Sequence, residues 1–429
     1  MNAAWNSYPM PAPRAEALYG DRIVRCYAER PQGLHAMFAA ACARAPSACA
    51  LSCDGVRLTY AQCDAIVQRL AAGLAARGVR AGQRVVMFIS NRLEFVPVLL
   101  ALARLGAVAV PVGVREQRPG LAYIARQCGA IAIVADAALT ARLPDAGEAP
   151  ALRLRVAIGD GTDSVSGCVA YGDLLAHDAP APATAEPAET EVALILYTSG
   201  TTGNPKGAML THLNIAHSVL HYQVCMKLRD AEVSALAVPA SHVTGLIAII
   251  ATMLQVAGTT VIVPEFRAES FVALMAAERV THTLMVPAMY NLCLLQPRFA
   301  QADLSAWRIG GYGGAPMPVS TIDALAEALP GLTLLNCYGA TETTSPTTMI
   351  PIGRTRDHAD SVGVALPLAE VRVMDDAGRE VAPGETGELW IAGPMVVPGY
   401  WANPEATTAS FTAGWWHSGD LGSVDAQGY

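Results

Sequence analysis

Strand-like and helical patterns of apolar residues alternate through the first part of the chain. Thr59 stands three residues before Gln62, the spacing of a helix-capping box, and an amphipathic helical face follows. A β-branched run at 84–89, an apolar helical segment at 94–105 and a second strand-like run at 108–112 come next. This alternation predicts a mostly parallel sheet covered by helices on both faces. The apolar positions of the first helix are Cys63, Ile66, Val67, Leu70 and Leu74.

A segment rich in proline and alanine, 177–190, divides this pattern and is typical of a linker or long surface loop. Strand-like and helical runs alternate again up to about residue 330. Beyond it, short strand-like runs such as 397–401 are separated by Asp/Gly and Pro/Gly turns. The sequence therefore predicts an α/β protein with α/β subdomains at 1–190 and 191–330 and a β-rich segment at 331–429.

One uncharged stretch of 21 residues, 243–263, is long enough on count alone to cross a bilayer. It contains threonines, a glutamine and two glycines, and it splits into a helical part at 243–256 and a β-branched part at 259–263. The stretch therefore predicts a buried helix followed by a buried strand, with no membrane span.

Composition narrows the classes of function. Hydrophobic residues make up 52% of the chain, and 29 Lys and Arg against 37 Asp and Glu give a net charge of −8, so no nucleic-acid partner is expected. The ten cysteines form no CxxC pair and indicate neither a zinc framework nor a disulfide scaffold. The first twenty residues lack the apolar core of a secretory signal, so we expect a cytoplasmic protein.

The strongest chemical signal is the loop within LILYTSGTTGNPKGAMLTH, 194–212, which directly follows a hydrophobic strand. Its glycines let backbone N–H groups approach phosphate oxygens, its hydroxyls donate hydrogen bonds, and its one lysine adds positive charge. The lysine is followed by glycine rather than Ser or Thr, so this is not a Walker A loop. The loop predicts a polyphosphate site formed by Thr198, Ser199, Gly200, Thr201, Thr202, Gly203 and Lys206.

At this loop the chain resembles the adenylate-forming superfamily of acyl-CoA synthetases, nonribosomal-peptide adenylation domains and firefly-luciferase-like enzymes. The resemblance covers nearly the whole chain, from LTYAQCDAIVQRLAAGL at 58–74 through GGYGGAPMP at 310–318 and NCYGATETT at 336–344 to GWWHSGDLG at 414–422. It implies that the β-rich segment is a distorted barrel, and that ATP, Mg²⁺ and CoA are the cofactors.

The resemblance also implies roles for single residues. Tyr338 would stack on adenine and Asn336 would face its amino edge, with Gly313, Gly314, Ala315 and Gly339 beside them. Asp420 would hold the ribose hydroxyls, Thr341 would contact the α-phosphate, and Glu342, with Thr201, would hold magnesium, for which a carboxylate is a suitable hard ligand. Lys206, Thr341 and Glu342 are the expected catalytic residues.

The carboxylic-acid pocket is expected at His242, Thr244, Gly245 and Tyr312. Ser241 replaces the aromatic residue that the family usually has before this histidine. The segments 241–249 and 309–315 contain no lysine or acidic residue, which favours an uncharged aryl or medium aliphatic acid over an amino acid or dicarboxylate. His217 and His221 are four residues apart, but no third ligand is evident, so we predict no metal site there.

These residues predict ATP-dependent activation of a carboxylic acid to acyl-AMP, followed by transfer to CoA. The chain ends nine residues after Asp420, before the hinge and smaller C-terminal domain of the family, so we expect a truncated ligase that makes acyl-AMP slowly. Two alternatives are an adenylation domain that loads a carrier protein and a non-catalytic nucleotide-binding module.

Overall fold

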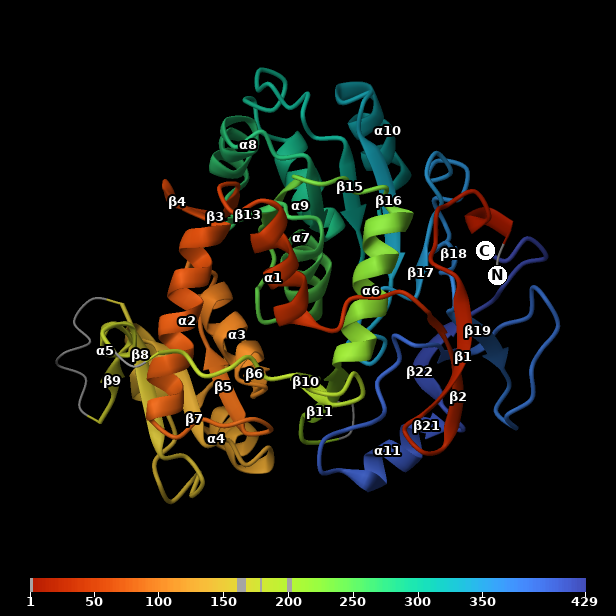
Figure 1. Cartoon of the computed structure of the whole chain (residues 1–429). Helices are drawn as coiled ribbons and strands as arrows, with labels where there is room; N and C mark the ends of the chain where they lie inside the picture. Colours follow the sequence, from red (N-terminus) through yellow and green to blue (C-terminus); the bar gives the residue numbers. More distant parts are fainter. Residues whose placement is uncertain (1–2, 160–166, 178–179, 199–202) are drawn as a thin grey trace.

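The first sheet of the computed structural model (Figure 1) has seven strands in the order β11-β10-β6-β5-β7-β8-β9. The structure describes residues 3–159, 167–177, 180–198 and 203–429. The sheet is parallel from β10 to β9, and β11 turns back antiparallel to β10. The strands are β5 (Arg84–Phe88), β6 (Val108–Pro111), β7 (Ala132–Asp136), β8 (Leu154–Ile158), β9 (Val169–Ala170), β10 (Val192–Thr198) and β11 (Lys206–Thr211).

The second sheet has nine strands in the order β18-β17-β16-β15-β14-β12-β13-β3-β4. It is parallel from β16 to β3 and antiparallel at both edges. The strands are β3 (Cys49–Cys53), β4 (Val56–Thr59), β12 (Val233–Leu236), β13 (Thr259–Ile262), β14 (His282–Met285), β15 (Ile309–Tyr312), β16 (Thr333–Tyr338), β17 (Thr348–Met349) and β18 (Val364–Ala365).

Residues 370–422 form a four-stranded antiparallel sheet in the order β19-β20-β22-β21, so a β-rich segment follows the α/β part, although the first strands after residue 331, β16 to β18, still belong to the second sheet. An N-terminal hairpin, β1-β2, lies beside this sheet (Figure 1), where Arg22 approaches Gly414. The strands are β1 (Pro13–Leu18), β2 (Arg22–Tyr27), β19 (Glu370–Met374), β20 (Gly387–Ala392), β21 (Phe411–Thr412) and β22 (Trp415–Gly422).

The strand predicted at 397–401 does not form. Pro398 has no N–H to donate, and Gly399 adopts a φ of +155°. What remains is a single antiparallel bridge between Tyr400 and Ala208 of β11. We call residues 394–401 the strap, because they lie along β11 and join it to the β-rich sheet.

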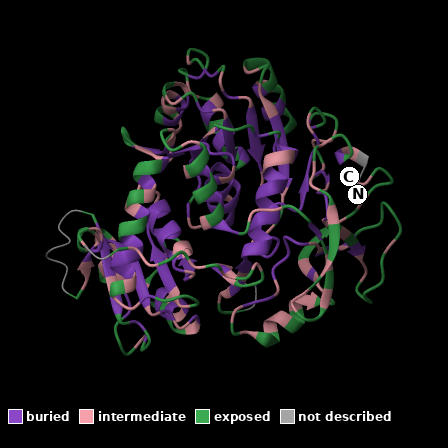
Figure 2. Cartoon of the chain, in the orientation of Figure 1, coloured by how far each residue is buried: buried purple, intermediate pink, exposed green. Residues whose placement is uncertain are grey.

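The helices cover the sheets as the alternating pattern requires. Helix α2 begins with the predicted capping box between Thr59 and Gln62 and contacts α3 and α5. Nearly every residue of α6 is buried (Figure 2), since it packs on η4 and α7. The helices are η1 (Ala3–Trp5), α1 (Leu34–Arg44), α2 (Tyr60–Ala76), α3 (Phe95–Arg104), α4 (Arg118–Gln127), η2 (Ala137–Arg142), α5 (Tyr171–Leu175), α6 (His212–Cys225), η4 (Thr244–Ala251), α7 (Thr252–Gln255), α8 (Ala268–Ala277), α9 (Pro287–Leu294), α10 (Val319–Ala328) and α11 (Pro404–Ser410).

The uncharged stretch forms a helix followed by the buried strand β13, as predicted. The first part of that helix is a π-helix, η4, in which both the backbone N–H and the hydroxyl of Thr252 reach the carbonyl of Ile247, five residues earlier. The hydroxyl bond is 2.9 Å long. Among the described residues, no helix is both long and apolar enough to cross a membrane.

The sheets do not follow the division predicted at residue 190. Strands β10 and β11 lie after this residue yet complete the first sheet, whereas β3 and β4 lie well before it and complete the second. Each large sheet is therefore built from residues on both sides of the proline-rich segment 177–190.

Candidate active site

The predicted phosphate loop is a hairpin that joins two strands at the edge of the first sheet. β10 ends at Thr198 and β11 begins at Lys206, and these two residues are paired in register. Glycine is required at 207, because a Cβ there would lie 2.7 Å from the Ile195 side chain. Of the other predicted loop residues, Gly203 is exposed, and Ser199, Gly200, Thr201 and Thr202 lie outside the described residues.

Glu342 follows β16 and places a buried carboxylate against the base of this hairpin. The hydroxyls of Thr198 and Tyr400 both donate to its Oε1, at 3.2 and 3.0 Å. Within the described part of the chain, Oε2 accepts no hydrogen bond and neither oxygen has an ion pair. A carboxylate that is only 7% exposed needs positive charge nearby, so the free oxygen fits a cation.

Lys206 lies on the other side of Tyr400. Its ammonium nitrogen stands 4.6 Å from the centre of the Tyr400 ring, a cation–π distance. The structure thus brings Thr198, Lys206 and Glu342 together around one tyrosine. Gly339 and Thr341 lie in the same loop as Glu342, and a Cβ at Gly339 would come within 3.1 Å of Pro346.

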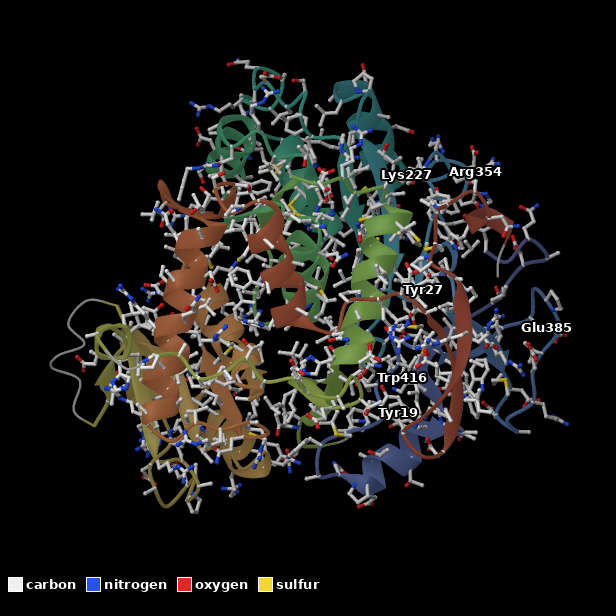
Figure 3. The ribbon with its side chains drawn as sticks, in the orientation of Figure 1. Tyr19, Tyr27, Lys227, Arg354, Glu385 and Trp416 are labelled. Carbon is white, nitrogen blue, oxygen red and sulfur yellow. The ribbon has the colours of Figure 1, made fainter. Side chains whose placement is uncertain are left out.

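A second pair of side chains includes Tyr338, four residues before Glu342. The hydroxyl of Tyr338, at the end of β16, donates to Oδ2 of Asp420 in β22 at 2.6 Å. Burial and the adjacent carboxylate raise the pKa of the Tyr338 phenol, so it remains a donor at neutral pH. The Tyr338 ring packs beside a small apolar cluster that includes Val396 of the strap and Trp416, which is labelled in Figure 3.

The other predicted nucleotide residues lie at the same ends of β15 and β16. Asn336 is buried opposite Tyr312, and its amide nitrogen donates to the carbonyl of Ser361 at 2.9 Å. Gly313 passes so close to β16 that a Cβ would lie 2.3 Å from the Cys337 carbonyl oxygen. Gly314, with a φ of +76°, and Ala315 are exposed beyond it.

The predicted acid-pocket residues are placed less closely together. His242 lies just before η4, its Nδ1 is 3.2 Å from the Thr244 hydroxyl, and desolvation lowers its pKa although part of the ring is exposed. Gly245 is required there, because a Cβ would lie 2.3 Å from the Pro239 carbonyl oxygen. Tyr312 is fully buried, and its hydroxyl has no partner among the described residues. No described contact joins His242, Thr244 or Gly245 to Glu342.

Sequence reasoning missed two residues that hold this site together. Tyr400 lay in the run that we predicted to be a strand, and only its contacts across the fold reveal it. Asn214 lies three residues after Thr211, and these two form a second capping box at the start of α6. That spacing is visible in the sequence and identifies the helix start.

Asn214 ties the strap to the phosphate hairpin. Its side-chain nitrogen donates to the carbonyls of Pro394 and Val396 at 2.8 and 3.1 Å. Its oxygen accepts from the backbone N–H of Thr211, the last residue of β11, at 2.9 Å. Tyr19, labelled in Figure 3, completes the group, with its hydroxyl 3.0 Å from that of Thr211.

The fold is that of an adenylate-forming enzyme. The N-terminal domain of FACL13 from Mycobacterium tuberculosis, solved with an inhibitor, has the same fold, with a TM-score of 0.84 and 29% identity over 92% of this chain and 98% of that domain. The sequence profile of the AMP-binding enzyme family matches residues 38–401, and the chain belongs to this family.

Two similar relatives are named as a CoA synthase and a CoA ligase. The feruloyl-CoA synthase of Amycolatopsis sp is 34% identical over 400 residues, which cover 93% of this chain and 78% of that protein. The indoleacetate–CoA ligase of Aromatoleum aromaticum is 31% identical over 373 residues, which cover 87% of this chain and 72% of that protein.

Proposed function

We propose that the chain activates a carboxylic acid with ATP and passes the acyl group to CoA. A carboxylate oxygen attacks the α-phosphorus, the bond to the bridging oxygen breaks, and pyrophosphate leaves with the bonding electrons. The CoA thiol then attacks the acyl carbon, loses its proton and releases AMP. The observation that carries the proposal is that Thr198, Lys206 and Glu342 meet around Tyr400, beside the Tyr338–Asp420 pair.

The chain's own residues position two anions against each other and balance their charge. Lys206 and the hairpin amides would bind the departing phosphates, and Thr341 would contact the α-phosphate. Asp420 would accept hydrogen bonds from the ribose, with Tyr338, Asn336 and the glycines at 313–314 around adenine. Glu342, with Thr201, would hold Mg²⁺, which supplies positive charge to the polyphosphate when bound.

We propose an uncharged aryl acid as the substrate, with a medium aliphatic acid as the alternative. The segments 241–249 and 309–315, where the pocket is expected, contain no lysine or acidic residue. Two relatives are named for feruloyl and indoleacetate groups, both of which contain an aromatic ring. An amino acid would require a carboxylate against its ammonium group.

Binding of a stable adenylate analogue tests the proposal. An aryl acid joined to adenosine through a sulfamate should bind this chain roughly 100-fold or more tighter than AMP, measured by isothermal titration calorimetry, because it occupies both subsites at once. Equal affinity for the analogue and for AMP would instead support a non-catalytic nucleotide-binding module.

The acceptor is tested separately. The protein should form a thioester with free CoA when supplied with ATP and the preferred acid. Thioester formed only on a phosphopantetheinylated carrier protein would support the carrier-dependent alternative and contradict the ligase proposal.

A further inference from the structure

We propose that Tyr400 is a positioning residue that holds the Glu342 carboxylate and the Lys206 ammonium ready for metal and phosphate while keeping them apart. The inference rests on the proposed function and adds a residue that neither the motifs nor the family resemblance assigned.

The first step is that Tyr400 touches both charges with different parts of its side chain. Its hydroxyl donates to Glu342 Oε1 at 3.0 Å, and the face of its ring lies 4.6 Å from the Lys206 ammonium nitrogen. A phenol hydroxyl is a donor to carboxylate, and the electron-rich ring face attracts a cation.

The second step is that Tyr400 cannot readily move. It is 3% exposed, and its backbone N–H donates to the Thr407 hydroxyl at 3.0 Å. Backbone hydrogen bonds join the strap to β11 on either side of Tyr400. The N–H of Met209 donates to the carbonyl of Gly399 at 3.1 Å, and the N–H of Trp401 donates to the carbonyl of Gly207 at 2.7 Å. The rings of Phe411 and Tyr400 pack edge to face, with their centres 5.8 Å apart.

The third step is that the two charges do not pair directly. No ion pair within 4.0 Å joins Lys206 to Glu342 in the described residues. A direct pair would neutralise both groups and would have to break before either could meet a ligand. A cation–π contact is weaker than a charge-assisted hydrogen bond to phosphate, so Lys206 can leave the ring for a phosphate oxygen.

The fourth step is that the hydroxyl fixes which oxygen of Glu342 stays free. Tyr400 and Thr198 both donate to Oε1, and within the described residues Oε2 has no partner, so Oε2 is the oxygen available to a cation. Without the phenol hydroxyl, the carboxylate would be oriented by Thr198 alone. Tyr400 therefore acts through Glu342 on metal binding and through Lys206 on phosphate binding.

The test is the Mg²⁺ dependence of ATP binding, with the α,β-methylene analogue of ATP as the probe and isothermal titration calorimetry as the measurement. Tyr400→Phe keeps the ring and removes the hydroxyl. We expect the Mg²⁺ concentration for half-maximal binding to rise roughly tenfold, with little change in affinity at saturating Mg²⁺. Tyr400→Leu should also weaken binding at saturating Mg²⁺, because the ring no longer holds the Lys206 ammonium in place beside the hairpin before the phosphate arrives.

Tyr123→Phe is the matched control. The Tyr123 hydroxyl donates to the carbonyl of Pro205 in the same hairpin, at 3.3 Å, and touches neither charge. This variant should leave the Mg²⁺ dependence unchanged. Tyr400→Phe is nearly isosteric, so it carries the test even where Tyr400→Leu fails to fold.

The outcomes separate this inference from the proposed function. If the unaltered chain shows Mg²⁺-dependent binding and Tyr400→Phe has the same Mg²⁺ midpoint, Tyr400 is a packing residue and the inference is wrong. If Tyr123→Phe shifts the midpoint as much as Tyr400→Phe, the effect belongs to the hairpin as a whole and the inference is again wrong. Absence of Mg²⁺-dependent binding by the unaltered chain would overturn the proposed function itself.

Discussion

At the scale of single residues, the exposed carboxylate of Asp420 is held by one short hydrogen bond. The Tyr338 hydroxyl donates to Oδ2 at 2.6 Å, and no side-chain hydrogen bond to Oδ1 is present among the described residues. The pair joins the end of β16 to β22, so the proposed adenine and ribose contacts come from two different sheets. Their relative placement depends on the packing of these sheets.

Asp420→Asn should weaken ATP binding by roughly tenfold, because an amide offers one acceptor where the carboxylate offers two. The preference for ATP over 2′-deoxy-ATP, measured by calorimetry with both nucleotides, should shrink at the same time. Asp376→Asn, in an exposed turn of the same β-rich segment, is the control. An unchanged preference in Asp420→Asn would show that this carboxylate does not contact the ribose.

The motif residues could be named from the sequence because each lies in a short run with unusual composition. Lys206, Glu342 and Asp420 stand in such runs, and the fold brings the first two to either side of Tyr400. Tyr400 could not be named, because its partner Glu342 is 58 positions away and its own run resembles a strand. Residues 199–202 lie outside the described residues, so their proposed contacts stay predictions.

At the scale of elements, α6 joins the phosphate hairpin to the strap through its first turn. Asn214 is fully buried, and all of its side-chain hydrogen-bonding capacity is used. A buried amide with every partner present stabilises a single arrangement of the segments that it joins. The position of the strap therefore depends on the start of this helix.

Asn214→Ala should lower the free energy of unfolding by about 2–4 kcal/mol, because it removes a cap contact and leaves buried carbonyls and an N–H without partners. The measurement is the urea midpoint followed by circular dichroism. Asn403→Ala removes a partly exposed cap of α11, which accepts from Ala406 N–H at 3.0 Å, and should cost only about 1 kcal/mol. Equal losses in the two variants would contradict the role given to Asn214.

Elements with a clear apolar period were predictable, and elements without one were not. α2 has a capping box and one apolar face, and it forms where the pattern predicts. The segment that forms η4 is apolar on every side, so periodicity cannot distinguish a π-helix from an α-helix there. The strap failed as a strand because proline and glycine interrupt it at 398 and 399.

At the scale of the whole molecule, four histidines are buried in their neutral form. Burial lowers the pKa of His212, His217 and His282 to about 4 and that of His221 to about 3. The unfolded chain has histidine pKa values of about 6.5. Between these values the unfolded state binds more protons than the folded state, so folding becomes less favourable as pH falls.

The free energy of unfolding should therefore decrease as pH is lowered from about 6.5 to about 4, by up to about 1.4 kcal/mol per pH unit for each such histidine. Urea midpoints measured across this range give the slope. His221→Leu should reduce the slope, whereas His177→Leu, with its side chain in the proline-rich segment, serves as the control. A slope that His221→Leu leaves unchanged would show that His221 does not contribute.

Each large sheet combines strands from distant parts of the chain, and this order also determines how the polypeptide can fold during synthesis. The early hairpin β3-β4 pairs with β13, so its open edge stays unpaired on the ribosome until Thr259–Ile262 emerges. Unpaired strand edges are the surfaces at which growing chains aggregate. Dividing the chain at residue 190 would separate β10 and β11 from the rest of the first sheet, and β3 and β4 from the rest of the second. Neither fragment would then be an autonomous folding unit.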